Sequence, residues 1–181
     1  PISQPRQHAN KRTSVIPGNL VIFLTIEIPE SKAEELFRKF GFGIMSDGKI
    51  IFHPLEIAYL LEKGKIDSSG ETASSILQKL KPEDPLAEEK YAVLKELRIN
   101  GYIAKPSFAK EEWMRVYRKG FRPAEDRTQF LIKVLEKDIK LEYNSIQADM
   151  RKAAEVRKEL VYCVVENNKP EFFRLSRTSF D

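Results

Sequence analysis

Apolar residues in the first half of the chain follow both strand and helix spacings. The run LVIFLTIEI is β-branched and aromatic, which predicts a strand. After it, apolar residues recur every three or four positions, which predicts helices. The predicted elements are a strand at residues 20–28, a helix at 32–40 capped by Ser31, a strand at 49–52, and helices that start at Pro54 and at residue 72. Together they predict a small mixed α/β unit.

The second half contains more strand-like runs. Its predicted elements are a helix that Asp84 caps and that runs to Asn100, strands at residues 102–105, 113–117 and 129–135, a helix at 144–156, and strands at 159–165 and 171–176. In the later helix, Ile146, Met150 and Ala153 fall on one face and are expected to cover a sheet. The order of elements predicts a mixed sheet flanked by helices.

The segment KPEDP, residues 81–85, is the predicted boundary between two domains, because it holds two prolines and three charged residues. The N-terminal domain then spans residues 20–80 and the C-terminal domain spans 86–181. Residues 1–19 contain several basic residues and no acid, which predicts a disordered basic tail.

The overall composition is that of a soluble globular protein, with 41% hydrophobic and 32% charged residues. A net charge of +4 permits nucleic-acid binding, and the Lys- and Glu-rich charge content fits a thermophile. The sequence has no apolar run near the roughly 18 residues that span a bilayer, so a cytoplasmic location is expected. One cysteine, Cys163 in an apolar run, and two histidines, His8 and His53, are too few for a zinc site. We expect no metal and no cofactor.

Six segments in a fixed order carry a family resemblance. They read PLEIAYLLEKGKI, YAVLKELRINGYIAK, RVYRKG, QFLIKV, VRKELVYCVV and FFRLSR. This ordered set resembles the archaeal tRNA-intron splicing endonucleases over nearly all of residues 20–181. The resemblance implies an N-terminal α/β domain, a nuclease domain with a restriction-endonuclease-like α/β/α fold, and a tetramer. It also implies cleavage of precursor tRNA at bulge–helix–bulge sites, which leaves a 2′,3′-cyclic phosphate and a 5′-hydroxyl.

Catalytic members of that family use a tyrosine, a histidine and a lysine. The reaction needs a base for the 2′-hydroxyl, an acid for the leaving 5′-oxygen and a cation for the charge on phosphorus, but no metal. The resemblance places the tyrosine at Tyr117 and the lysine at Lys158, whereas the histidine position holds Arg127. A guanidinium retains its proton about six pKa units above an imidazole, a difference of about 8 kcal/mol. Arg127 can hold a phosphate, but it cannot replace the general acid.

A second departure lies near Tyr117. The family usually has a glycine ten residues before the tyrosine and a Phe-Gly pair a few residues later, where this chain has Ser107 and Lys110–Glu111. Some archaeal enzymes of the family combine a catalytic and a structural subunit in a 2+2 tetramer. The degenerate triad predicts that this chain is the structural subunit and that a catalytic endonuclease subunit is its partner.

Several basic residues are candidates for contact with RNA. Catalytic family members stack two arginines on a bulged base, and by position these match Arg151 and, more loosely, Arg177. Near the tyrosine, the further candidates are Arg115, Arg118 and Lys119.

The last strand and the loop before it are the candidate subunit interface. The resemblance implies that the strand pairs with its equivalent in a second subunit, and an apolar edge strand needs such cover. It also implies that the acidic loop enters a pocket of the opposite pair, although Lys169 makes this loop only mildly acidic. The candidate residues are Phe172, Phe173, Leu175, Phe180, Glu166 and Glu171.

Two other functions stay open at this point. In the first, the chain is an active nuclease with altered acid chemistry, and Tyr117 is then essential. Alternatively it is a plain RNA-binding module that uses its basic tail and the basic residues around Tyr117, and binding is then tight and strongly salt-dependent.

Overall fold

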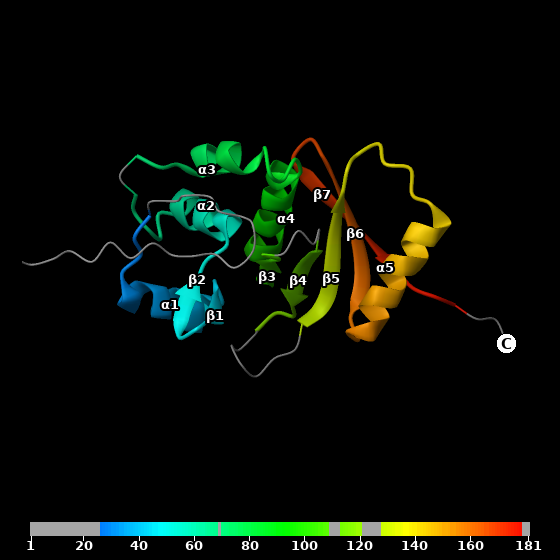
Figure 1. Cartoon of the computed structure of the whole chain (residues 1–181), viewed down its shortest axis with the longest axis horizontal. Helices are drawn as coiled ribbons and strands as arrows, with labels where there is room; N and C mark the ends of the chain where they lie inside the picture. The colour runs from blue at the N-terminus through cyan, green and yellow to red at the C-terminus, as the bar shows by residue number, and fades with distance from the viewer. Residues whose placement is uncertain (1–25, 69, 109–112, 121–127, 179–181) are drawn as a thin grey trace, which may run out of the picture.

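A five-stranded sheet in the second half of the chain organises the molecule, and the N-terminal unit packs beside one of its edges (Figure 1). The structure is a computed structural model, and it describes residues 26–68, 70–108, 113–120 and 128–178. The predicted basic tail lies outside these ranges, as does most of the strand predicted at residues 20–28.

Five short elements make up the N-terminal unit. They are helix α1 (Glu30–Phe40), strands β1 (Ile44–Ser46) and β2 (Lys49–Ile51), and helices α2 (Pro54–Glu62) and α3 (Ala73–Leu80). The two strands form an antiparallel hairpin, of which only the second strand was predicted. The hairpin turns at Asp47 and Gly48, whose φ values of 48° and 72° suit a two-residue type I′ turn.

Two predicted helix starts are wrong. α1 begins directly after Pro29 rather than after Ser31, because the proline holds an extended backbone with φ −55° and ψ 142°. α4 (Ala87–Ile99) begins three residues beyond Asp84, the predicted cap. The Asp84 carboxylate accepts from the Leu86 amide at 3.3 Å and binds the Lys90 ammonium at 2.8 Å, but residues 85 and 86 form a turn before the helix.

The large sheet follows α4 in the chain. Its strands are β3 (Ile103–Pro106), β4 (Trp113–Tyr117), β5 (Thr128–Leu135), β6 (Glu159–Glu166) and β7 (Lys169–Leu175), and α5 (Tyr143–Glu155) connects β5 to β6. The strands lie in chain order, so β3 and β7 are the two edges. Only β5 and β6 run parallel, because the helical crossover returns the chain to the same end of the sheet. The predicted mixed sheet is confirmed.

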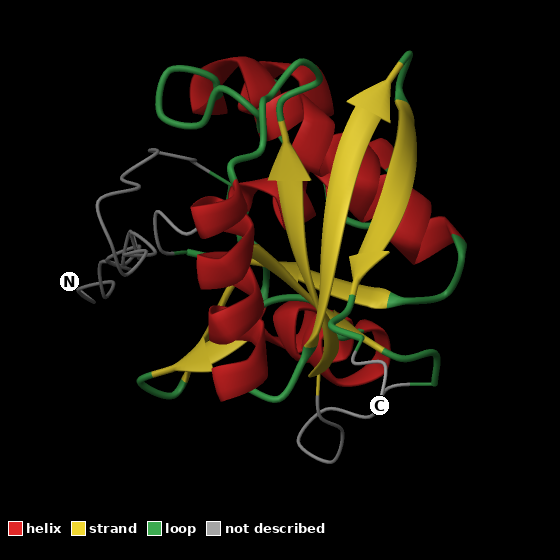
Figure 2. Cartoon of the chain, turned by 90° about the vertical axis from the view of Figure 1, so that its right-hand side faces the viewer, coloured by secondary structure: helices red, strands yellow, loops and turns green. Residues whose placement is uncertain are grey.

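Helices cover both faces of this sheet (Figure 2). Alternate strand residues, including Met114, Ile132 and Cys163, face α4 and join the N-terminal helices in one hydrophobic core. The intervening residues, including Trp113 and Tyr162, face α5 and form a second, smaller cluster. The predicted α/β class and the burial of Cys163 are therefore confirmed.

Within the described ranges, no helix has both the length and the apolar character needed to cross a bilayer. The same ranges contain no cluster of three or more His, Cys, Asp or Glu side chains that could hold a metal ion.

Candidate functional site

Tyr117 and Lys158 converge on one residue, Thr128. Tyr117 ends β4 and is the register partner of Thr128, just after a bulge that begins at Val116. Lys158 immediately precedes β6, and its ammonium group donates a hydrogen bond to the Thr128 carbonyl. Arg127 is the residue before Thr128 in the chain and lies outside the described residues. Two of the three predicted triad positions therefore share one neighbourhood at the start of β5.

The end of α5 fixes where the backbone places Lys158. The Arg157 amide donates to Ala154 O and the Lys158 amide donates to Ala153 O, each at 2.9 Å. This pair of bonds is a Schellman motif, which normally has glycine where this chain has Arg157 at φ 55°. A left-handed arginine costs on the order of 1–2 kcal/mol relative to its ordinary conformation. The helix end therefore holds Lys158 with a strained residue beside it.

The other RNA-binding candidates lie on exposed surfaces. Arg115 and Arg118 are exposed on and after β4, and the Lys119 ammonium sits 5.1 Å from the centre of the Tyr102 ring. Arg151 is exposed on α5, and Arg177 is exposed two residues beyond β7. Their contact with RNA stays a prediction.

The candidate interface residues fall on an open edge of the sheet. β7 pairs with β6 on one side, and within the described chain no strand pairs with its other side. The Phe172 and Phe173 side chains, one for each face of the sheet, are 40% and 51% exposed. Leu175 packs partly against the α5 cluster, whereas Phe180 lies outside the described residues.

The loop before β7 is shorter than the predicted turn at residues 166–170. It contains only Asn167 and Asn168, with φ 51° and 60°, between Glu166 and its register partner Lys169. The Glu166 carboxylate also binds the Lys137 ammonium at 2.6 Å, and this contact lowers the pKa of Glu166. Glu171 lies in β7 itself.

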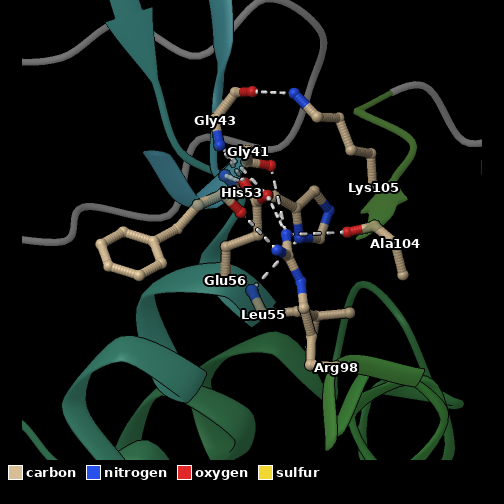
Figure 3. A network of polar contacts seen from close by, with 9 residues as sticks. Gly41, Gly43, His53, Leu55, Glu56, Arg98, Ala104 and Lys105 are labelled. Atoms are coloured by element: carbon tan, nitrogen blue, oxygen red, sulfur yellow. Dashed lines mark hydrogen bonds and ion pairs between the residues drawn. The ribbon is translucent and has the colours of Figure 1, made fainter. Parts of the chain in front are cut away.

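A buried polar junction joins the N-terminal unit to the half that contains the large sheet (Figure 3). Glu56 on α2 is 2% exposed, and it accepts hydrogen bonds from the Gly43 amide at 3.1 Å and the His53 amide at 3.0 Å. Its carboxylate lies 3.7 Å from the Arg98 guanidinium of α4. Lys105 of β3 donates to Gly43 O at 2.5 Å. α2, α4 and β3 therefore meet around one carboxylate.

Arg98 binds backbone carbonyls from both halves of the chain. It donates to Phe40 O at 2.7 Å and to Gly41 O at 3.2 Å in the N-terminal unit, and to Ala104 O of β3 at 3.2 Å. Its guanidinium also stacks 3.8 Å from the centre of the Phe42 ring. Burial lowers the pKa of Arg98 to about 10, so it remains a cation at neutral pH.

The junction also perturbs two other titratable groups. Burial raises the pKa of Glu56, while Arg98 and the backbone amides that donate to its carboxylate oppose this shift. Burial likewise lowers the pKa of His53 to about 3, so its ring is neutral and its Nδ1 accepts from the Leu55 amide at 3.1 Å. The prediction that this helix starts at Pro54 is confirmed, and His53 is its N-cap. The ring also meets Phe108 edge-on at 5.2 Å, which ties α2 to the segment after β3.

A cavity of about 360 Å³ lies beside this junction. It is bounded by the ends of α1 and α2 and by the passage from α4 into β3. Basic and aromatic side chains dominate the lining, which comprises Leu36, Lys39, Phe40, Phe42, Tyr59, Lys63, Lys65, Arg98, Gly101, Tyr102 and Ile103.

Two domain families match the chain in order. Residues 17–77 match the tRNA intron endonuclease N-terminal domain, and residues 87–171 match the tRNA intron endonuclease catalytic C-terminal domain. A tRNA-splicing endonuclease of Thermococcus onnurineus is 33% identical over 156 residues, which are 83% of this chain and 90% of that protein. The chain belongs to the tRNA intron endonuclease family.

Two other tRNA-splicing endonucleases are similar over about three quarters or more of both chains. That of Pyrococcus furiosus is 35% identical over 83% of this chain and 89% of its own length. That of Methanopyrus kandleri is 31% identical over 74% of this chain and 76% of its own length. The similarity spans both halves of this tRNA intron endonuclease family member.

Sequence reasoning missed the Glu56–Arg98 junction. One signal was present, because Glu56 stands three residues after His53 in the spacing of a capping box, and the structure forms that box. Nothing in the local sequence pairs Arg98 with Glu56, since they are far apart in the chain and belong to helices of different units.

Proposed function

We propose that this chain is the non-catalytic, structural subunit of a heterotetrameric tRNA-splicing endonuclease that cleaves precursor tRNA at bulge–helix–bulge sites. The observation that carries the proposal is Arg127 at the position where the family resemblance expects the histidine general acid. A guanidinium at that position holds its proton too tightly to donate it to the leaving 5′-oxygen at neutral pH.

The open edge of the sheet supports an assembly role. Phe172 and Phe173 expose apolar surface on both faces of β7. An edge strand of this kind promotes uncontrolled association unless another chain covers it. We propose that the equivalent strand of a second family member, the catalytic subunit, pairs with β7 and extends the sheet.

Reconstitution tests this proposal. The purified chain is incubated with an intron-containing precursor tRNA, alone and together with a family member from the same source that has a histidine at the Arg127 position. We expect no cleavage by the chain alone and cleavage by the mixture, with 5′-hydroxyl products. The matched control is the partner with that histidine replaced by alanine, which should leave the mixture inactive. Efficient cleavage by this chain alone contradicts the proposal.

A second function has one observation in its favour. Tyr117 pairs with Thr128 in the sheet and the Lys158 ammonium binds the Thr128 carbonyl, so both predicted positions lie beside the start of β5. In this alternative the chain cleaves RNA itself with water as the proton source, and Tyr117→Phe in this chain abolishes the activity of the assembled enzyme. A plain RNA-binding module predicts instead tight binding of RNA by the isolated chain, which weakens steeply as salt is added.

A further inference from the structure

Three helices of the chain end in the same backbone motif. At the ends of α2, α4 and α5, one amide donates to the carbonyl three residues earlier, and the next amide donates to the carbonyl five residues before it. The first of these two residues has a positive φ in each helix, at Gly64 (58°), Gly101 (82°) and Arg157 (55°). A Cβ added at either glycine would meet no atom within 4 Å, so these glycines serve backbone conformation and not close packing. α5 therefore carries an arginine where the other two helices carry glycine.

Arg157 is also an exception in the rest of the described chain. All seven described glycines have positive φ, and the other described residues in that region are Asp47, Asn167 and Asn168. Asparagine and aspartate tolerate this conformation because their short polar side chains bond locally. Arg157 is thus the one described residue held there that is not Gly, Asn or Asp. Backbone strain of this kind is found most often at functional sites.

The folded chain gives no stabilising reason for an arginine here. The Arg157 side chain is exposed and forms no hydrogen bond or ion pair with a described residue. The carboxylate of nearby Glu159 binds the Arg174 guanidinium instead, at 3.2 Å. The dipole of α5 does favour a cation at this end, but at an exposed site that attraction is smaller than the cost of a left-handed side chain. On stability alone, glycine is the better residue.

The position of Arg157 indicates what the side chain binds. It immediately precedes Lys158, whose ammonium group binds the Thr128 carbonyl beside Tyr117. Residues 151–158 contain four basic residues and one acid, so an anion that approaches this helix end meets net positive charge. A guanidinium forms charge-assisted, bidentate hydrogen bonds to phosphate, and the enzymes of this family act on precursor tRNA. A phosphate of the RNA backbone therefore fits this residue.

We infer that Arg157 contacts a backbone phosphate of the precursor tRNA, so that this chain holds the RNA beside its degenerate triad without cutting it there. The inference rests on the proposed function and deepens it, because the chain then contributes to substrate binding as well as to assembly. It also explains the strain, since glycine in this motif relaxes the backbone but cannot bind a phosphate.

Arg157→Gly tests the inference, because it should stabilise the chain and weaken RNA binding together. The affinity for a labelled intron-containing precursor tRNA is measured by fluorescence anisotropy for the full chain, alone and assembled with the partner whose histidine is replaced by alanine. In the assembled enzyme we expect at least about fivefold weaker binding, and a plot of log affinity against log salt that is shallower by about one. The urea midpoint of the isolated chain should rise.

Two other variants separate charge from backbone. Arg157→Lys keeps the positive charge, so the salt dependence should stay close to that of the native chain. Lys81→Gly removes an exposed charge from the turn after α3 and should leave the affinity for the tRNA unchanged. A purely structural role for Arg157 gives no such contrast, because all variants that fold would then bind the tRNA equally.

Three results overturn the inference. They are absent tRNA binding, or equal binding by Arg157→Gly, in both states of the chain; a urea midpoint that falls; and a loss of assembly with the partner. The second would show that Arg157 stabilises the fold, and the third would assign it to a protein contact. Failure of the proposed function is seen separately, as cleavage of the precursor tRNA by this chain alone.

Discussion

The two edges of the large sheet differ in whether the rest of the chain covers them. At β3 the chain covers its own edge, since Lys105 and Arg98 bind backbone carbonyls of the N-terminal unit around the buried Glu56. At β7 the chain leaves the edge open and exposes Phe172 and Phe173. One edge therefore stabilises the monomer, and we propose that the other serves assembly.

We therefore expect residues at the β3 edge to affect stability and residues at the β7 edge to affect association. Substitutions at the β3 edge should lower the stability of the isolated chain, because they break a buried charge pair. Substitutions at the β7 edge should leave that stability almost unchanged and weaken association instead. The predictions below test this division in order of decreasing effect.

The largest effect is expected for Glu56→Ala. It leaves the buried Arg98 guanidinium without its counter-charge and two backbone amides without their acceptor, which should cost about 3–5 kcal/mol in the free energy of unfolding. Urea denaturation followed by circular dichroism measures it. The control is Glu88→Ala, because Glu88 pairs with Lys81 at 3.4 Å on the surface and its loss should cost under about 1 kcal/mol. Equal costs for the two variants would show that the junction at β3 contributes no more to stability than a surface ion pair does.

Phe173→Lys should act on assembly alone. A lysine on an exposed edge strand opposes pairing, so association with the partner should weaken at least tenfold, as seen by analytical ultracentrifugation. The urea midpoint of the isolated chain should stay within the range of an ordinary surface substitution, about 0.5 kcal/mol. Arg174→Lys, on the same strand, is the conservative control and should assemble normally. Unaltered assembly of Phe173→Lys contradicts the role given to β7.

His53→Asn should flatten the dependence of stability on pH. The folded pKa of His53 is about 3, against about 6.5 in the unfolded chain, so the unfolded state binds the proton between these values. Stability is therefore lost as the pH falls below about 6.5, and by pH 5 the loss is about 2 kcal/mol. Asparagine keeps a capping oxygen for α2 and does not titrate. Thermal unfolding at neutral and acidic pH should show a smaller difference for the variant, and an equal difference would place the titration elsewhere.

The smallest effect is expected at the end of α5. Arg157→Gly relieves a left-handed arginine and should raise the free energy of unfolding by up to about 1 kcal/mol. Arg157→Ala removes the same charge but keeps the strain, so it should not stabilise the chain. Equal urea midpoints for the two variants would show that backbone strain at this position is negligible.

Most of the fold could be predicted from the sequence, because its elements have clear local periodicity. The predicted strand at residues 113–117 coincides with β4, and the end of the first helix at Phe40 coincides with the end of α1. The three-residue strand β1 was missed, since a run of that length has no measurable alternation. Asp84 misled the prediction of where α4 begins, because it accepts the Leu86 amide in a turn that precedes the helix rather than in the helix itself.

The candidate site could be predicted only in part. The positions of Tyr117 and Lys158 came from motifs, and the fold brings both to Thr128. Only tertiary packing brings Glu56 close to Arg98 and assembles the lining of the basic cavity. The spacing of residues along the chain therefore could not predict either feature. The tight turn at Asn167 could be recognised from its two asparagines, which tolerate positive φ. The ion pair between the neighbouring Glu166 and Lys137 depends on the fold.

One measurement tests the central claim most directly. Single-turnover cleavage of an intron-containing precursor tRNA is followed with the assembled enzyme, in which Tyr117→Phe is introduced into this chain only. If this chain is structural, the cleavage rate is unchanged, and replacing the matching tyrosine of the partner abolishes cleavage. A loss of about 100-fold or more from Tyr117→Phe, in an enzyme that still assembles, would show that this chain performs the chemistry itself.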